Sequence, residues 1–344
     1  MKERVLSVEN LSVAFRLDGG EANAVRGVDF YLEKGETLAL VGESGCGKSA
    51  TAKALMGLLP PSAKITGGSI FYGGRDATKL SERELCAYRG SVISMVFQDP
   101  FSSLNPIMRV GRQLTEAMLI KNAYRKKSGV PVLTKREAKA RAIRLMEEVG
   151  ITEAGRRFRR YPFEFSGGMR QRLVIAIALA ADPEILICDE PTTALDVRVQ
   201  AQIIELIKRL QKERKLSVLF ITHDLGVVAK IADRVAVMYA GKIVEYGKSE
   251  EIFYHAQHPY TWALLASSPS LATGNRLPSI AGSPPSLSDE ILGDAFAPRN
   301  PYALEIDFEQ EPPFFEVSKT HFAATWLLHP NAPKVHREGE EKDA

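Results

Sequence analysis

The segment Gly42-Glu43-Ser44-Gly45-Cys46-Gly47-Lys48-Ser49 is a complete phosphate loop of the pattern Gly-x-x-x-x-Gly-Lys-Ser/Thr. Its glycines let backbone N–H groups point inward around the β- and γ-phosphates of a nucleoside triphosphate, at the positive end of the following helix. Lys48 adds a cation that reaches the β/γ oxygens, and Ser49 offers a hydroxyl to Mg²⁺. The motif follows an apolar strand at 37–41 and opens a helix that includes Ala50. This context predicts a nucleotide site that extends from Gly42 to Ala50.

Short apolar runs alternate with helical segments along much of the chain. The expected strands are 37–41, 91–97, 185–188, 218–222 and 234–238. Continuous apolar runs are typical of strands buried on both faces, and their alternation with helices predicts an α/β fold with a doubly wound, mainly parallel sheet. Residues 5–16 and 24–32 alternate like outer strands, and 241–247 reads as a hairpin element. The clearest amphipathic helix is 135–149, and the helix that opens at Lys48 is expected to end at Leu59-Pro60-Pro61.

The strand at 185–188 ends in two carboxylates, Asp189 and Glu190. Ligands of such sheets sit at the carboxyl ends of the strands. Asp189 would hold the metal ion directly or through water, and Glu190 would polarise the attacking water as a general base. Alone, an Asp-Glu pair before Pro191 would more often be a helix cap. The phosphate loop favours the catalytic interpretation.

The overall composition is that of an ordinary globular protein. The 344 residues are 45% apolar and 25% charged, and the net charge of +3 is too small to predict a nucleic-acid binder. The three cysteines form no C-x-x-C pair, which excludes a disulfide framework. The N-terminus lacks the apolar region of a signal peptide, and the longest apolar stretch is about half of the ~20 residues that span a bilayer. We therefore expect a chain in the cytoplasm that reaches the membrane only through a partner.

The segment Ser166-Gly167-Gly168-Met169-Arg170-Gln171 resembles the signature motif of ABC ATPases, whose consensus is Leu-Ser-Gly-Gly-Gln. Phe165 and Met169 replace the two outer residues, while the serine and both glycines, which make the phosphate contact in that family, are kept. Ser166 is expected to cap a helix that runs through 172–181, so that its N-terminus can face a γ-phosphate. In this family the opposite subunit binds that phosphate. The resemblance therefore implies two ATP molecules sandwiched between two such domains.

Other elements of the ABC ATPase family match residue by residue. Gln98 matches the Gln loop, which touches the metal and senses the transmembrane partner. Ala194-Leu195-Asp196 matches the loop that crosses to the other subunit, and His223 matches the switch histidine that contacts the γ-phosphate and orders the water. The resemblance implies ATP and Mg²⁺ as ligands, with Glu190 and His223 as catalytic residues. The implied metal ligands are Ser49, Gln98 and Asp189.

The same family places an aromatic side chain against the adenine. Phe15 lies at the matching position, although Phe30 or Tyr31 could take this role. The resemblance also completes the expected architecture, a P-loop NTPase core with an antiparallel β subdomain. The helical and charged stretch at about 100–168 would be the helical subdomain that receives the transporter's coupling helices.

Several segments are similar to one branch of the family, the D-type ATPase subunit of oligopeptide/dipeptide and nickel importers. They are 98–106, 239–245, 258–261 and 282–302. This resemblance covers almost the whole chain and implies an ATP-hydrolysing subunit that powers uptake of oligopeptides or dipeptides. The implied partners are a second, different ATPase subunit, two transmembrane permease subunits and an external peptide-binding protein, with no nucleic acid. The cargo stays open, since nickel or another small solute also fits this branch.

The composition becomes proline-rich beyond about residue 255. We therefore expect an ATPase domain at 1–255 and a small C-terminal extension at 256–344, disordered from 337 onward. In many relatives the extension carries four cysteines, read as iron–sulfur ligands. The matching residues here are Asp294, Asn300, Asp307 and Thr325, so no iron–sulfur cluster is expected. Apolar packing is expected to hold the extension instead, through Phe296, Tyr302, Phe308 and Trp326.

Two other function classes fit the sequence less well. A soluble ABC ATPase acting on nucleic acid or ribosomes would carry two fused ATPase domains, a long coiled coil or zinc ligands, whereas this chain has one phosphate loop and no cysteine pairs. A regulatory module with a dead site would lack catalytic groups. The intact Lys48, Asp189, Glu190 and His223 argue against it.

Overall fold

The computed structural model describes residues 3–17, 20–122, 131–193, 195–268 and 280–335. The predictions for Ala194 and for disorder at 337–344 lie outside these ranges.

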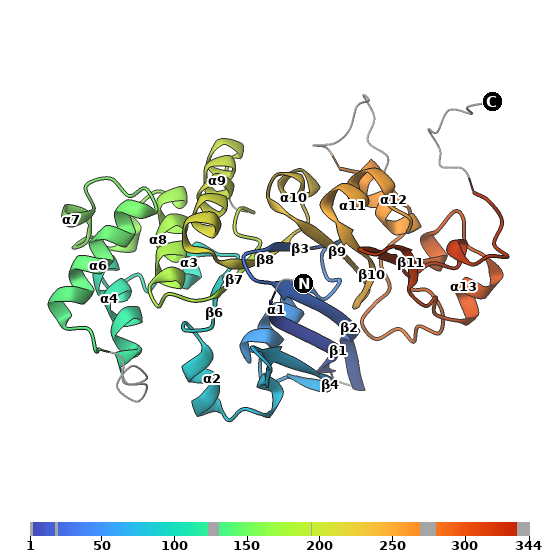
Figure 1. The fold of residues 1–344 in the computed structure, drawn as a ribbon, viewed down its shortest axis with the longest axis horizontal. Coiled ribbons are helices and arrows are strands. Elements are labelled where there is room, and N and C mark those ends of the chain that lie inside the picture. The colour runs from blue at the N-terminus through green and yellow to red at the C-terminus, as the bar shows by residue number, and fades with distance from the viewer. Residues whose placement is uncertain (1–2, 18–19, 123–130, 194, 269–279, 336–344) are drawn as a thin grey trace.

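An eight-stranded sheet runs through the centre of the molecule (Figure 1). Its strands, in sheet order, are β11 (Phe315–Ser318), β12 (His321–Ala323), β10 (Lys242–Lys248), β9 (Arg234–Tyr239), β3 (Thr37–Val41), β8 (Ser217–Thr222), β7 (Ile185–Asp189) and β6 (Ile93–Val96). The run from β9 to β6 is parallel, and β10, β12 and β11 extend it with antiparallel pairs. The predicted mainly parallel sheet is therefore confirmed. Because β3, β6, β7 and β8 are parallel, their carboxyl ends meet at one edge.

Helices cover both faces of this sheet, as a doubly wound fold requires. They are α1 (Lys48–Met56), α2 (Glu82–Tyr88), α3 (Pro100–Ser103), α4 (Val110–Ile120), α6 (Lys135–Glu148), α7 (Ala154–Arg157), α8 (Gly167–Leu179), α9 (Val197–Arg214), α10 (Leu225–Ile231), α11 (Ser249–His255), α12 (Pro259–Ala266) and α13 (Glu305–Glu309), with the 3₁₀ turns η1 (Ala77–Lys79), η2 (Pro162–Glu164), η3 (Ala297–Arg299) and η4 (Trp326–Leu328). In Figure 1, α9, α10 and α11 lie above the sheet and α1 below it. Helix α1 ends at Met56 because Gly57 caps it in the left-handed conformation, and not at the prolines that follow.

A second, antiparallel sheet lies below the first. Its order is β2 (Gly20–Glu33), β1 (Arg4–Leu17), β4 (Ala63–Tyr72) and β5 (Arg75–Asp76). Buried side chains from β1, β2 and α1 form one apolar cluster with one face of the main sheet, for example Leu11, Leu32 and Leu55 with Leu38 and Leu40. This sheet is the predicted antiparallel β subdomain.

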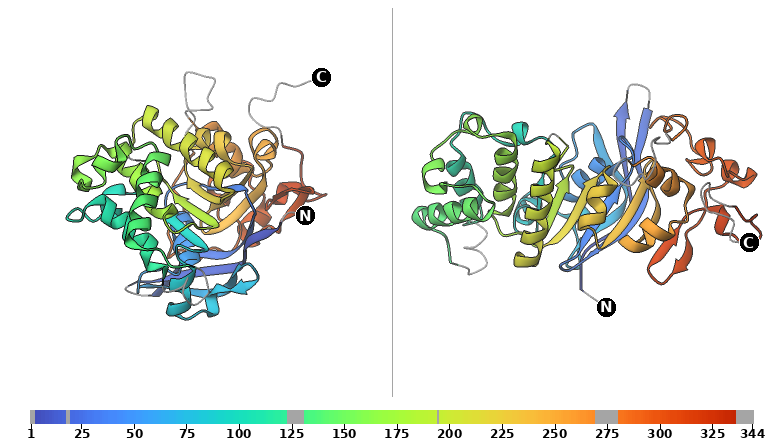
Figure 2. Two further views of the ribbon diagram at one scale, coloured as in Figure 1. Left: turned by 60° about the vertical axis from the view of Figure 1, so that its left-hand side comes forward. Right: turned by 90° about the horizontal axis from the view of Figure 1, so that it is seen from above.

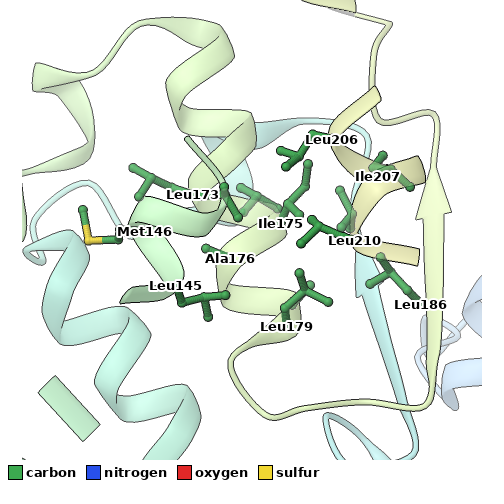
Figure 3. Close-up of a cluster of buried hydrophobic side chains, with 14 of the residues drawn as sticks. Leu145, Met146, Leu173, Ile175, Ala176, Leu179, Leu186, Leu206, Ile207 and Leu210 are labelled. Carbon is green, nitrogen blue, oxygen red and sulfur yellow. The ribbon is translucent and has the colours of Figure 1, made fainter. Parts of the chain in front are cut away.

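The helical subdomain projects from one end of the molecule (Figures 1 and 2). Helix α6 begins where its periodicity predicted and ends one residue earlier than expected, and it buries Leu145 and Met146 against α8. Figure 3 shows these side chains beside Leu173 and Leu179 of α8 and Leu210 of α9. One continuous core therefore joins the subdomain to the sheet, so α8 is held firmly at its position.

The C-terminal extension lies at the opposite end (Figure 2). Its hairpin β11–β12 pairs with β10, as between Glu245 and Ala323, and thus enlarges the main sheet. Phe296 is buried against Tyr239 and Tyr260, and Trp326 packs on Phe315.

The expected apolar packing of the extension is right for three of its four residues and wrong for the fourth. Tyr302 packs edge-on against Trp262, but Phe308 is 54% exposed. Hydrogen bonds from backbone N–H groups to polar side chains also stabilise turns of the extension. In the positions matched to cysteines, a side-chain oxygen accepts a nearby backbone N–H: Asp294 from Phe296, Asn300 from Tyr302, Asp307 from Leu304 and Thr325 from Leu327.

Candidate functional site

The phosphate loop connects β3 to α1 at the carboxyl edge of the main sheet. Two of its glycines, Gly42 and Gly47, are required by both conformation and space. Gly47 has φ 104°, and a Cβ there would lie 2.4 Å from the carbonyl oxygen of Ala24. A Cβ on Gly42 would lie 2.1 Å from the carbonyl oxygen of Met238. The first turn of α1 contains no acidic residue, so its positive end is available to an anion.

Lys48 is buried and its ammonium lies over the loop. Its Nζ donates to the carbonyl oxygens of Gly42 at 2.8 Å and Glu43 at 2.7 Å. Cys46 lies beside it, and burial raises the pKa of this thiol. The thiol therefore stays neutral, and the only charge that the loop interior presents to a phosphate is the ammonium.

Ser49 and Asp189 come together from α1 and β7. The Ser49 hydroxyl donates to a carboxylate oxygen of Asp189 at 3.1 Å. Burial raises the pKa of Asp189, and the carboxylate therefore gains from a nearby cation. Among the described residues, no group of three or more His, Cys, Asp or Glu could hold a metal ion. The hydroxyl and carboxylate oxygens nevertheless fit Mg²⁺, which takes few protein ligands and completes its shell with water and nucleotide phosphates.

Glu190 is the centre of a hydrogen-bonded group that joins three strand ends. Its Oε2 accepts from Gln98 Nε2 at 3.1 Å and from the Thr193 hydroxyl at 2.8 Å. Its Oε1 lies 3.3 Å from Nδ1 of His223, whose side chain is 55% exposed. Glu190 itself has φ 45°, a left-handed conformation that costs a non-glycine residue about 1–3 kcal/mol and is concentrated at functional sites. The predicted Glu190, Gln98 and His223 thus lie in direct contact.

An open cleft of about 670 Å³ collects these residues. Most of the predicted nucleotide residues line it, including Phe15, Lys48, Gln98 and His223. Phe15 is half-buried there, whereas Phe30 is buried in the core below and Tyr31 lies against Arg234. Of the three candidate aromatics, Phe15 is thus the one that lines the cleft, and its stacking on adenine stays a prediction.

Comparison with known proteins agrees with this arrangement. The family model described as ABC transporter matches residues 25–193. The chain is 56% identical to the oligopeptide transport ATP-binding protein OppD of Bacillus subtilis over 335 residues, 96% of this chain and 91% of that protein. It is also 56% identical to the dipeptide transport ATP-binding protein DppD of Lactococcus lactis, covering 97% of this chain and 94% of the relative. The chain belongs to the ABC transporter family.

Two further comparisons extend the family assignment. A model described as the C-terminal region of oligopeptide/dipeptide transporters matches residues 244–306. The ATP-binding cassette MJ0796, solved as a dimer in a post-hydrolysis state with ADP and Pi, superposes with a TM-score of 0.62 at 26% identity, covering 71% of this chain and 98% of that structure. The chain is thus an ABC-type ATPase with the α/β architecture predicted from its sequence.

The ABC signature segment lies outside the cleft. Ser166 occupies the N-cap position of α8, but its hydroxyl makes no capping hydrogen bond, so the predicted cap is right in position and wrong for the side chain. A Cβ on Gly168 would lie 2.5 Å from Val199 of α9, whereas one on Gly167 would meet only Leu195 at 3.8 Å. Met169 lines a separate hollow with Arg157. Packing within the chain therefore requires a glycine at 168 but leaves room for a side chain at 167.

Asp196 begins α9. Its carboxylate accepts from the backbone N–H groups of Arg198 and Val199 at 3.1 and 3.0 Å, which is a regular helix cap. The predicted contact of Asp196 with another subunit stays a prediction.

Four lining residues of the cleft were missed in the sequence, Ala24 of β2 among them. Thr193, three residues after Glu190, carries a hydroxyl whose place beside the carboxylates was a usable signal. Leu264 of α12 and Leu287 beyond it reach the cleft from the C-terminal extension. Their positions gave no local signal, because tertiary packing alone brings the extension to the nucleotide site.

Proposed function

We propose that this chain is the ATP-hydrolysing subunit of an ABC importer that takes up oligopeptides or dipeptides. The observation that carries the proposal is the joining of two features in one chain. One is a cleft with Lys48, Glu190 and His223 in hydrolytic arrangement, and the other is the C-terminal region typical of peptide transporters. Neither feature alone would point to both ATP hydrolysis and peptide uptake.

In this mechanism Glu190 takes a proton from a water whose oxygen attacks the γ-phosphorus. The bond from that phosphorus to the bridging oxygen of ADP breaks, which gives ADP and phosphate. His223, next to Glu190, orders the water and contacts the γ-phosphate. Lys48 and the amides of the phosphate loop counter the developing negative charge. Mg²⁺, held by Ser49 and Asp189 with Gln98 alongside, would supply further charge neutralisation.

Ser166, Gly167, Gly168 and Met169 would bind the ATP of the partner ATPase, and Asp196 would lie at the boundary between the two subunits. The exposed N-terminus of α8 and the free capping capacity of Ser166 support this role. Two sites shared in this way would close when ATP binds and reopen after hydrolysis.

The conformational change that accompanies closing and reopening would be transmitted to the membrane subunits through the helical subdomain. Gln98 contacts Glu190 and lies two residues before the start of α3. Beyond it, Phe101 and Ile107 are 60% and 85% exposed, and Phe163 is 67% exposed. Large exposed apolar side chains that gather into a patch are typical of a surface covered by a partner.

The complex we propose contains a second ATPase of different sequence, two transmembrane permease subunits and an external peptide-binding protein. No described helix combines the length and apolar content needed to cross a bilayer. This subunit would therefore bind peripherally at the cytoplasmic face, with 1–255 as the ATPase domain and 256–344 as its extension. Nickel or another small solute is the alternative cargo.

The test is reconstitution of the chain with its permease subunits and partner ATPase in lipid vesicles. ATP hydrolysis should rise when a binding protein loaded with peptide is added, and Lys48→Ala in this chain should remove the response. Stimulation by nickel but not by peptide would select the alternative cargo. Purification with ribosomes or RNA, and not with detergent-solubilised permeases, would overturn the proposal.

A further inference from the structure

In the described part of the chain, the C-terminal extension hydrogen-bonds to the phosphate loop at Glu43. The backbone N–H of Glu43 donates to the hydroxyl of Tyr260 at 2.9 Å. Its carboxylate accepts two hydrogen bonds from the guanidinium of Arg299, at 2.7 and 3.1 Å. Tyr260 belongs to α12 and Arg299 ends η3. We name this group the Tyr260–Glu43–Arg299 latch.

Both partners of Glu43 are held firmly. Tyr260 is fully buried and packs on Tyr239 with ring centroids 4.5 Å apart, and burial raises the pKa of its hydroxyl, which therefore stays neutral. The Arg299 side chain is 4% exposed and donates also to the Tyr239 hydroxyl at 3.1 Å and to the carbonyl oxygen of Ala281 at 2.8 Å. Its hydrogen bonds to Glu43 raise the pKa of Arg299. Side chains fixed in this way can position what they touch.

The third polar group of Glu43, its backbone carbonyl, faces Lys48 within the phosphate loop. Its carbonyl oxygen accepts from the ammonium of Lys48 at 2.7 Å. One residue therefore joins Tyr260 through its amide, Arg299 through its carboxylate and Lys48 through its carbonyl. A change in the extension that moves Glu43 must alter the path of the loop backbone beside Lys48.

We propose that the C-terminal extension is a positioning element of the ATP site, and that the Tyr260–Glu43–Arg299 latch sets the phosphate-loop conformation that binds the nucleotide. Arg299 and Tyr260 are positioning residues and do not touch the phosphates. A loop ordered in advance loses less entropy on binding, so the latch lowers the Kd for ATP. The same ordering serves ground state and transition state alike, so kcat changes little.

The decisive variant is Arg299→Met, with Glu311→Gln as the matched control. Glu311 also ties the extension to the body, by accepting from Arg26 at 3.2 Å and pairing with Lys242, but it does not touch the phosphate loop. Arg299→Met should raise the Kd for ATP about tenfold, which corresponds to about 1.4 kcal/mol. Glu311→Gln should leave the Kd unchanged, and Arg299→Lys should restore part of the lost affinity because it keeps the charge without the two-pronged contact.

A double-mutant cycle with Glu43→Ala, which removes the acceptor for Arg299, separates positioning from general stability. If Arg299 acts through Glu43, adding Arg299→Met to Glu43→Ala should change the Kd by less than twofold. Equal tenfold effects of Arg299→Met in both backgrounds, or an unchanged Kd in a folded Arg299→Met protein, would overturn the inference. Should Arg299→Met fail to fold, Tyr260→Phe provides a second test, because it removes only the hydroxyl that accepts from the backbone N–H of Glu43. It should also raise the Kd for ATP. The inference rests on the ATP site and not on the cargo, and ATP titration of the isolated chain needs no permease. Failure of peptide-stimulated hydrolysis would therefore leave it intact.

Discussion

Replacing Glu190 by Gln tests the central assignment of the site with little change of shape. The Gln amide oxygen can take the place of Oε2 and keep the bonds from Gln98 and Thr193. Its NH₂ group would then face Nδ1 of His223, which can accept when it carries no proton. The left-handed backbone at this position suits Gln no worse than Glu. We therefore expect Glu190→Gln to fold and to bind ATP.

The expected loss of rate is far larger than the expected loss of stability. Two hydrogen bonds lose a charged acceptor and keep a neutral one, which costs about 1–2 kcal/mol in the free energy of unfolding. Removing a general base slows the chemical step by about 10²–10⁴-fold, or about 2.7–5.5 kcal/mol at 1.36 kcal/mol per factor of ten. The two effects can therefore be separated in one protein.

The assay is single-turnover phosphate release from the reconstituted ATPase pair, with nucleotide affinity measured on the same protein. Glu190→Gln should hold ATP at the wild-type Kd, release phosphate at least a hundredfold more slowly, and keep the pair closed in its ATP-bound form. The control is Glu205→Gln, an exposed glutamate on α9. A Glu190→Gln rate within threefold of the control would refute the general-base role and would mean that another group deprotonates the attacking water.

Three further predictions concern residues around this centre. Burial raises the pKa of Asp189, so between the ordinary and the raised pKa the folded state binds more protons than the unfolded chain. The unfolding free energy therefore falls as pH rises through that window, and the penalty is complete once the pH exceeds the raised pKa. Asp189→Asn should accordingly unfold at an equal or higher urea concentration at pH 7.5 without nucleotide but lose stabilisation by MgATP, and a lower urea midpoint would contradict this. Gly168→Ala should destabilise the chain by about 1–3 kcal/mol, because the added methyl group would collide with Val199. Gly167→Ala should keep the Tm and reduce hydrolysis only in the assembled pair. Equal losses of Tm in the two variants would argue against an intersubunit role of Gly167. Phe15→Ala should raise the Kd for ATP about 5–15-fold in a fluorescent-nucleotide titration, and Phe15→Tyr should keep the affinity of the unmodified chain. An unchanged Kd for Phe15→Ala would contradict a stacking role for Phe15.

The central strands were predictable because burial on both faces leaves a continuous apolar run. Every residue of β3, β7 and β8 is buried, and their bounds in the structure differ from the expected ones by at most one residue. The hairpin β11–β12 was not predicted. Its outer strand is half-exposed, and its place in the sheet comes from pairing with β10, nearly eighty residues earlier in the chain. The local sequence pattern of a strand does not reveal a pairing partner so far away in the chain.

The same distinction applies to the site. Gln98, Glu190 and His223 each follow a strand, and parallel strands bring such residues to one edge, so their meeting was predictable. Leu264 and Leu287 reach the cleft only because the extension folds back onto it. Phe308 illustrates the opposite failure, since an aromatic residue in a short helix gives no indication of which face will be covered.

The polar turns of the extension and the latch on the phosphate loop belong to one chain of contacts. Asp294 accepts from the backbone N–H of Phe296 at 2.9 Å and thereby fixes the turn that carries this ring. Phe296 packs on Tyr260 with ring centroids 5.3 Å apart, and Tyr260 in turn accepts from Glu43. A buried carboxylate is tolerated where backbone donors satisfy it, so Asp294 can order this region by hydrogen bonding, without thiolate ligands. Loss of the Asp294 turn should therefore act on ATP affinity through Phe296 and Tyr260, although Asp294 itself contacts neither the loop nor the nucleotide cleft.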